Sequence, residues 1–368
     1  MATKVRFAQF NISLSLPEQG AIKQQLLNQS HPRFKKLASI ILKTAPDVLL
    51  LCEFDHPGEG GDDGSLDIFC RDYLTDHASN SNKLLYPYAY CPPSNTGLLA
   101  SVSLHGEKIP SLPDDGIGFG FHHGHFSFVL LSKYPIDTNN IRSWQKLLWK
   151  NLPSHSIPEN YYSPQALNEL RLSSKNHCEI PITINDKQVS VLASHPTPPV
   201  FDGIEQRNKR RNKDELKLIH EMLDPASSVL DDSGRQGGLR LEQSFVIMGD
   251  LNADPINGDG ETQVIRDLLS HKRVNQRVSH GSLMPKSKGA VQARVWQPRK
   301  GERASWTHIN GLRLDYVLPS TDLNAIGSGV FWPAQGSSER ALICDEKGRE
   351  RAQAGSDHRL VWVDIEIE

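Results

Sequence analysis

Residues 244–255 read SFVIMGDLNADP, and this stretch decides how the rest of the chain is interpreted. Phe245–Met248 is a short apolar run that predicts a buried strand, which Gly249 ends. Asp250 and Asn252 follow two residues apart, so both side chains would lie on one face if the backbone stayed extended. The carboxylate could then accept a proton from water and the amide could hold a phosphoryl oxygen. An Asx turn that only caps backbone amides explains the same residues, and this stretch by itself does not decide between the two.

The composition is that of an ordinary globular protein. The chain has 368 residues, of which 38% are hydrophobic and 23% are charged. This length predicts one large domain over residues 1–368, with surface insertions around residues 92–124 and 272–306. Because the formal net charge is only -2, contact with nucleic acid would need a local basic patch. No apolar run approaches the roughly 20 residues of a membrane helix, so we expect no transmembrane segment.

The N-terminus and the cysteines give little information on the compartment. Residues 1–12 enter a strand pattern at once and have no signal-peptide layout, which fits a cytosolic protein or one whose leader has been removed. Five cysteines are scattered without a CxxC pair, which argues against a zinc site and a dense disulfide framework. One bridge, between Cys70 and Cys91, is compatible with the sequence. Cys52, inside an apolar run, is most simply a small buried hydrophobic residue.

Polar residues recur at the ends of the first two predicted strands. A strand over residues 4–12 alternates in hydrophobicity and has Asn11 at its end. Residues 47–54, DVLLLCEF, are apolar on both faces and predict a fully buried strand that carries Glu53 near its end. A buried carboxylate is costly unless it is paired. A metal ion therefore explains Glu53 better than a solvated charge does.

Three later strands show the same feature. The second strand of a hairpin over residues 179–193 runs directly into His195. Asp315 is embedded in the strand RLDYVL, and Asp357 and His358 stand just before an alternating C-terminal strand. So many polar side chains at strand ends predict one shared site.

A long segment between two predicted strands could cover that site. Residues 92–124 are rich in Gly and Pro, and long loops in compact domains tend to be functional. The segment and the residue after it contain the run HHGH. We interpret His122, His123 and His125 as surface histidines rather than a ligand cluster, because their spacing does not match a zinc site.

Two basic segments are candidates for phosphate contact. In RNKRRNKDE, which leads into an amphipathic helix, Arg207, Asn208 and Arg211 would contact a substrate phosphate, although a solvated helix entry explains them equally well. Residues 286–303 carry six Lys and Arg against one Glu and include Trp296. Such a segment suits a nucleic-acid groove, while a solubilising loop is the commoner meaning.

These motifs together make the chain resemble the endonuclease/exonuclease/phosphatase superfamily. That group has the deoxyribonuclease I fold and includes abasic-site endonucleases, neutral sphingomyelinases and inositol polyphosphate phosphatases. Its motif order is an FN strand, an LxxE strand, an H strand, GDxN, a late D and a terminal SDH. Here the matching stretches are FNI, LLLCE, SHP, GDLN, RLDY and GSDH, which span essentially the whole chain. HPTPPVFDG and FGFHHGHFSFVLLSKYPI are similar to a bacterial branch usually described as exported phosphoesterases.

The resemblance implies the fold class and the cofactor. The fold would be an α/β four-layer sandwich, in which helices flank two packed, mixed but mainly antiparallel β-sheets, with the site at one edge of the sheets. The cofactor would be Mg²⁺, with Mn²⁺ or Ca²⁺ as alternatives. Glu53, Asn11 and Asp357 would supply hard oxygen ligands for it.

The same resemblance implies catalytic roles for the remaining residues. Asp250, steadied by Asn252, would activate water for in-line attack on phosphorus. His358 would stabilise the phosphoryl oxygen while Asp315 orients its ring. His195 would bind phosphate or assist the leaving group. Phosphoryl transfer of this kind requires no covalent enzyme intermediate.

Three functional classes fit these residues. A metal-dependent phosphodiesterase acting on DNA or RNA is favoured by residues 286–303, and we expect nucleic acid to be slightly preferred. A phosphoesterase for small or lipid-borne phosphates is favoured by the near-neutral charge and by the long segment 92–124. A catalytically inactive binding module would lack some of these residues, and none is missing. We expect an enzyme without a stable protein partner. The resemblance to the bacterial branch implies export, while the sequence itself leaves the compartment open.

Overall fold

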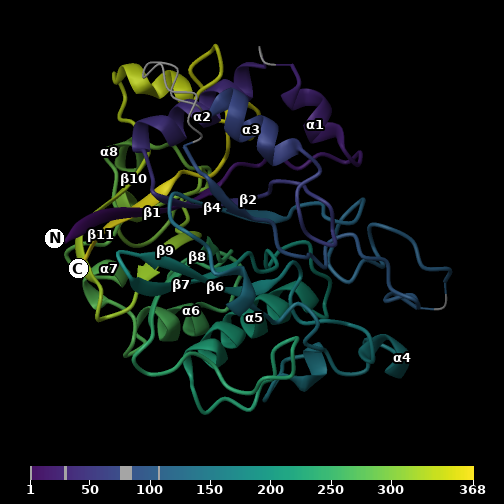
Figure 1. Cartoon of the computed structure of the whole chain (residues 1–368). Coiled ribbons are helices and arrows are strands. Elements are labelled where there is room, and N and C mark those ends of the chain that lie inside the picture. Colours follow the sequence, from purple (N-terminus) through teal and green to yellow (C-terminus); the bar gives the residue numbers. More distant parts are fainter. Residues whose placement is uncertain (1, 29–30, 75–84, 107) are drawn as a thin grey trace.

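The computed structural model describes residues 2–28, 31–74, 85–106 and 108–368, which form two β-sheets packed face to face (Figure 1). In spatial order, the strands of the first sheet are β10 (Asn324–Val330), β11 (Val361–Ile367), β1 (Thr3–Asn11), β2 (Val48–Cys52), β4 (Phe128–Ser132) and β3 (Tyr88–Tyr90). Those of the second sheet are β5 (Arg142–Ser143), β6 (His177–Ile184), β7 (Lys187–Ser194), β8 (Ser244–Asp250) and β9 (Asp315–Pro319). Only the pairs β1–β2 and β7–β8 are parallel.

Helices cover the outer face of each sheet. Over the first sheet lie α1 (Ala21–Leu26), α2 (Pro32–Thr44) and α3 (Ser65–Tyr73), and over the second lie α5 (Arg207–Leu223) and α6 (Thr262–Leu269). The connections hold α4 (Pro164–Leu167), α7 (Gln276–Ser279) and α8 (Lys288–Gln292), with 3-10 turns at η2 (Thr138–Asn140), η3 (Trp149–Asn151), η4 (Arg303–Ser305), η5 (Ser338–Leu342) and η6 (Ala352–Ala354). This arrangement confirms the predicted four-layer α/β sandwich. None of the helices in the described part of the chain is both long and apolar enough to cross a membrane.

Alternate residues of β8 face two different cores, which fixes where its last residue points. Val246 and Met248 belong to the core that joins both sheets, and β1 faces β8 and β9 across it. Phe245 and Ile247 belong to the core shared with α5 and α6. Because side chains alternate along a strand, Asp250 shares the face of Met248. The strand therefore delivers a carboxylate to the space between the two sheets.

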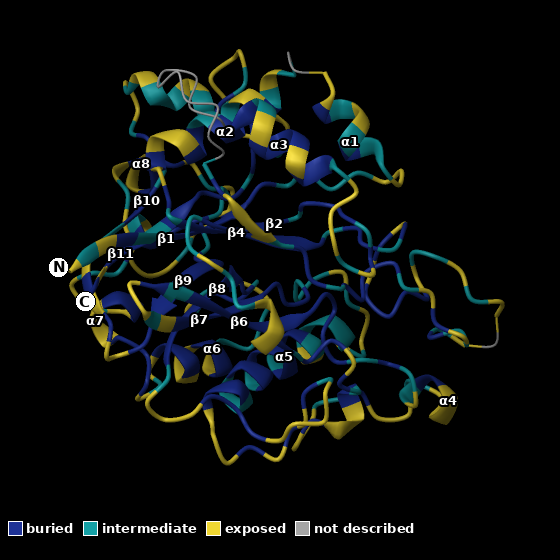
Figure 2. Cartoon of the chain, in the orientation of Figure 1, coloured by how far each residue is buried: buried dark blue, intermediate teal, exposed yellow. Residues whose placement is uncertain are grey.

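Strand β2 is buried along its whole length, as its apolar run predicts. Figure 2 shows the central strands mostly in the buried colour, while exposed residues lie on the outer helices, the loops and the edge strands β3 and β10. The strand is shorter than the predicted range 47–54, because Glu53 adopts a left-handed backbone with φ of 59°. This conformation costs about 1 kcal/mol or more in a residue with a side chain. It turns Glu53 out of the sheet at the strand end.

All five cysteines are buried and none forms a disulfide bond. The bridge considered between Cys70 and Cys91 is therefore not formed. Burial raises the pKa of Cys52 and of Cys91, so both stay neutral thiols. Cys52 lies in the core as the small hydrophobic residue that the sequence predicts.

Candidate active site

The polar residues predicted from strand ends meet at one end of the two sheets. Asn11 is the last residue of β1 and Asp250 the last residue of β8. Asp315 opens β9, and antiparallel pairing places it directly opposite Asp250. Asn11 Nδ2 donates a hydrogen bond of 3.0 Å to Asp250 Oδ2, which joins the two sheets at this point.

Asp250 Oδ2 is the centre of the cluster. Besides Asn11, it faces His195 Nε2 at 3.5 Å and His358 Nε2 at 3.6 Å. Burial by itself raises the pKa of Asp250, but His358, His195 and Asn11 together bring it below its ordinary value. The carboxylate is therefore ionised, as a group that accepts a proton from water must be.

His358 is held in the orientation that the sequence predicts. Its Nδ1 donates to Asp315 Oδ2 over 2.9 Å, and Thr307 Oγ1 donates to the same oxygen over 2.6 Å. Burial lowers the pKa of His358, but Asp315 and Asp250 raise it well above its ordinary value. The ring is therefore an imidazolium whose Nε2 remains available as a donor.

Two further carboxylates complete a strongly acidic site. Glu53 Oε1 accepts a hydrogen bond of 3.1 Å from Asn11 Nδ2, and burial raises the pKa of Glu53. Asp357 Oδ2 lies 3.5 Å from His308 Nε2. Burial raises the pKa of Asp357, but His308 and His358 bring it below the ordinary value. Carboxylates crowded in a poorly solvated site need a positive charge between them, and this oxygen donor set fits a hard divalent cation.

Asn11 is oriented as a bridge between carboxylates. Its amide nitrogen donates to Glu53 and Asp250, and its Oδ1 accepts from the backbone nitrogen of Ser13 over 3.0 Å. In this orientation it positions the predicted ligand Glu53 and the predicted base Asp250 relative to each other. That Asn11, Glu53 and Asp357 bind the metal directly stays a prediction.

Backbone contacts tie the two ends of the chain together under these residues. Ser356 Oγ donates to the carbonyl of Asn11 over 2.7 Å. Arg33, on α2, donates to the carbonyl of Gly355 over 2.9 Å and to that of Ser13. Asn11 and the SDH motif therefore stay in register although they come from opposite ends of the sequence.

Asn252 reaches the site by a different backbone path from the one expected. Its φ is 51°, so the chain does not stay extended beyond Asp250 and that expectation was wrong. The backbone nitrogen of Asn252 donates to Asp250 Oδ1 over 3.0 Å, which is the Asx turn of the alternative explanation. Asn252 Nδ2 donates to the carbonyl of Pro196 over 3.0 Å and so ties the strand that carries His195 to this turn.

The cluster opens into a cavity of about 640 Å³. At the catalytic end it is lined by Glu53, His195, Asp250, Asn252 and His358. Much of the remaining wall comes from segment 92–124 and from α5 with its preceding loop, and it includes Thr96, Leu104, His105, Asp114, Gly116, Phe119, Phe201, Arg207, Asn208 and Arg211. Phe126, Tyr162, Leu170, Ser174 and Lys175 add further parts of the wall. Segment 92–124 therefore covers the site, as its composition suggests.

The three residues predicted to contact substrate phosphate all line this cavity, but they differ in their partners. Arg211 donates to the carbonyls of Leu172 and Ile117 at 2.8 and 2.7 Å, so it anchors the cavity wall. Asn208 Nδ2 donates to the carbonyl of Val200 over 2.8 Å. Arg207 differs from both because its Nε is buried and forms no hydrogen bond within the described residues.

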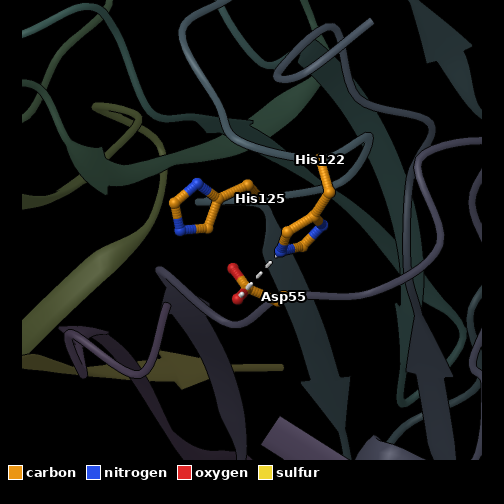
Figure 3. A group of neighbouring side chains, drawn as sticks. All are labelled: Asp55, His122 and His125. Carbon is orange, nitrogen blue, oxygen red and sulfur yellow. Dashed lines mark ion pairs between the residues drawn. The ribbon is translucent and has the colours of Figure 1, made fainter. Parts of the chain in front are cut away.

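The histidines of the HHGH run are not all on the surface, so that prediction was wrong for two of them. His122 and His125 are only 9% and 2% exposed and lie beside Asp55 (Figure 3). The carboxylate of Asp55 accepts hydrogen bonds of 2.8 Å from the backbone nitrogens of Leu16 and Phe126. His122 Nε2 donates to the carbonyl of Leu16 over 3.0 Å and lies 3.8 Å from Asp55.

The hydrogen bonds of this group anchor the cavity wall. His125 Nδ1 accepts from the backbone nitrogen of Phe121 over 3.3 Å, so in the neutral ring Nε2 carries the proton. Burial lowers the pKa of His125 to about 3, which keeps the ring neutral. Because Asp55 stands two residues after Glu53, the group fixes segment 92–124 next to the predicted metal ligand.

Lys175 was not among the residues predicted from the sequence. Its side chain is 6% exposed and lines the cavity beside Glu53 and Asp250. Burial lowers its pKa, which Glu215, Glu53 and Asp250 partly restore. It forms no ion pair or side-chain hydrogen bond with the rest of the described chain, which is costly for a buried ammonium group. A charged residue just before the buried strand β6 was the signal that could have revealed it.

Comparison with known proteins identifies the family. The model of the endonuclease/exonuclease/phosphatase family matches residues 8–358. The chain belongs to this family. It is therefore a metal-dependent hydrolase of phosphoester bonds, and its cofactor is Mg²⁺ or a similar divalent cation.

Several solved structures are similar to the chain at low sequence identity. The endonuclease/exonuclease/phosphatase of Beutenbergia cavernae has a TM-score of 0.53 and 15% identity, over 99% of this chain and 72% of that one. A family member from Bacteroides vulgatus has a TM-score of 0.48 and 13% identity over 100% of both chains. Beta toxin of Staphylococcus aureus, with bound magnesium ions, has a TM-score of 0.48 and 15% identity, over 98% of this chain and 99% of that one. No curated protein matches the chain.

The substitution Glu53→Gln tests the predicted metal ligand. We expect it to weaken Mn²⁺ binding, measured by isothermal titration calorimetry, by about tenfold or more, because a hard cation loses a charged oxygen ligand. The melting temperature of the metal-free protein should not fall, since a crowded carboxylate has been removed. Glu59→Gln, on the same loop but exposed, is the matched control. Unchanged Mn²⁺ affinity in Glu53→Gln would show that Glu53 is not a ligand.

Proposed function

We propose that this enzyme hydrolyses small phosphodiesters that enter a covered cavity, rather than long nucleic acids. The observation that supports this proposal is the wall formed over the catalytic residues by segment 92–124 and the first turns of α5. A cavity of about 640 Å³ has the size of a site for one small molecule. A duplex would need an open groove along the surface instead.

The basic segment 286–303 supports the same choice. None of its residues lines the cavity. Lys286 pairs with Glu302 at 2.7 Å, and Arg299 Nε donates to the carbonyl of Asn310 over 3.1 Å. Arg303 donates to a backbone carbonyl and stacks over Trp306, which is buried and so does not offer its face to a base. Three of the six cations of this segment are therefore engaged in local contacts.

The arrangement of charges suits in-line attack by water on a phosphodiester. The bound cation would neutralise negative charge on the phosphate. Asp250 is ionised and accepts a proton from the attacking water. His358 donates from Nε2 to a phosphoryl oxygen, and Asp315 holds the opposite nitrogen of its ring. Lys175 contributes a second positive charge, and its attraction for the phosphate strengthens as the substrate excludes water from the cavity.

Lys175 gives a prediction in which stability and activity change in opposite directions. Lys175→Met removes a buried cation without a partner while keeping its length, so the melting temperature should rise. The value of kcat/KM for bis(p-nitrophenyl) phosphate should fall by about tenfold to a hundredfold, the range for a lost charged contact. Lys146→Met, at an exposed position, is the control. If the variant is more stable and fully active, Lys175 has no role in the reaction.

A panel of substrates tests the proposed function itself. Bis(p-nitrophenyl) phosphate, p-nitrophenyl phosphate, sphingomyelin and plasmid DNA would be compared with Mg²⁺, Mn²⁺ or Ca²⁺ and with chelator. We expect the small diester to have the highest kcat/KM and all activity to be lost in chelator. The proposal is wrong if plasmid DNA is the best substrate, above all if neutralising Arg294 and Arg299 together abolishes its cleavage.

A further inference from the structure

The part of the cavity away from the catalytic residues contains an arginine with unused hydrogen-bonding capacity. Arg207 lines the cavity, its side chain is 28% exposed, and its buried Nε has no hydrogen-bond partner among the described residues. We infer that Arg207 forms a second anion-binding subsite, so that the preferred phosphodiester carries a further phosphate or carboxylate group. This inference rests on the proposed function.

The neighbours of Arg207 leave its charge available. One terminal nitrogen lies 2.7 Å from Nε2 of His105, whose pKa is lowered by burial and by Arg207 itself, so the histidine stays neutral. Glu205 forms a long ion pair with Arg207, with an oxygen 3.8 Å from Nε, but at this distance it does not accept a hydrogen bond from Nε. Arg211, the other arginine of the cavity, is already committed to backbone carbonyls. Of the two arginines, only Arg207 therefore has a side-chain donor left for an anionic group of the ligand.

Helix α5 carries Arg207 at its start and, further along, the residues that hold the catalytic loops. Further along the same helix, Asn212 donates to the carbonyl of Thr197 over 2.9 Å, and Glu215 accepts from the backbone nitrogens of Ser174 and Thr197 at 2.7 and 2.6 Å. These contacts hold the loops that carry His195 and Lys175. At the rise of a helix, Arg207 lies about 7.5 Å before Asn212 and about 12 Å before Glu215. The two anionic groups of a ligand would therefore be one to two helical turns apart.

The wall between the two ends is suited to an uncharged spacer. The cavity lining includes apolar side chains from segments that are distant in sequence, namely Leu104, Phe119, Phe126, Tyr162 and Leu170. Such a wall binds a spacer by burial of apolar surface and gives it no charged partner. The structure therefore fits a ligand with an apolar or neutral middle and an anion at each end.

Three chromogenic diesters that differ only at the far end test the inference. They are the p-nitrophenyl phosphodiesters of propanol, of 3-hydroxypropyl phosphate and of 4-hydroxybutanoate, and release of p-nitrophenol measures each one. With the Mg²⁺-loaded wild-type enzyme we expect kcat/KM to be about tenfold to a hundredfold higher for one or both anionic diesters, as for a charged hydrogen bond. The better of the two shows whether phosphate or carboxylate is the preferred group.

The ratio of kcat/KM for each anionic diester to that for the propanol diester should fall close to one in Arg207→Gln. Arg207→Lys should retain part of the preference for the anionic diesters, and Arg210→Gln should retain all of it. Arg210 is an exposed residue on the same helix and serves as the matched control. The inference is overturned if the wild-type enzyme shows no preference, or if Arg207→Gln leaves the ratios unchanged.

A comparison of inhibitors needs no variant and guards against a folding defect. Propane-1,3-diyl bisphosphate should inhibit the wild-type enzyme at least about tenfold more strongly than propyl phosphate. Equal inhibition contradicts the second subsite. If plasmid DNA is a better substrate than all three diesters, the proposed function fails; if the propanol diester is hydrolysed well and the anionic diesters gain nothing, only the inference on Arg207 fails.

Discussion

The buried carboxylate of Asp250 depends on donors from three distant parts of the chain. Asn11 comes from the first strand, His195 from the end of β7 and His358 from the loop before the last strand. Taking away one partner of a buried charge costs about 3–5 kcal/mol. The ends of β1, β7 and β8 therefore have to meet, and the two sheets have to pack in the one register that brings them together.

The same site shows how acidic residues are tolerated at the end of a hydrophobic core. Asp250 and Asp315 lie opposite each other in neighbouring strands, and the imidazolium of His358 lies against both. Glu53 has less compensation from the protein, because its pKa stays above the ordinary value, and this leaves room for a divalent cation. Lys175 is the reverse case, a buried cation whose partner would be the substrate. Charged residues at these positions make the fold less stable than apolar residues would. They also make the charge of the site complementary to a phosphate.

Most of the fold and of the catalytic cluster could be predicted from the sequence because their signals are local. The apolar run of β8 and the buried pattern of β2 place Asp250 and Glu53 at strand ends, and strand ends of a layered fold converge. The features that were missed depend on contacts between distant segments. The burial of His122 is caused by Asp55 and Leu16, the carbonyls that occupy Arg211 come from two loops, and Asn252 follows a turn rather than an extended strand. Lys175 was missed because its position before the buried strand β6 is only a weak signal, and its place in the cavity becomes visible only in the folded chain.

The central claim is that water, activated at Asp250, attacks phosphorus directly in line with the leaving group. The stereochemistry at phosphorus tests this most directly. A p-nitrophenyl phosphorothioate diester of one configuration would be hydrolysed by the Mg²⁺-loaded enzyme in oxygen-18 water, and the configuration of the product would be determined. A single displacement by water predicts inversion with one labelled oxygen bound to phosphorus. Retention of configuration would contradict the account, because it requires a covalent enzyme intermediate and a nucleophile other than water.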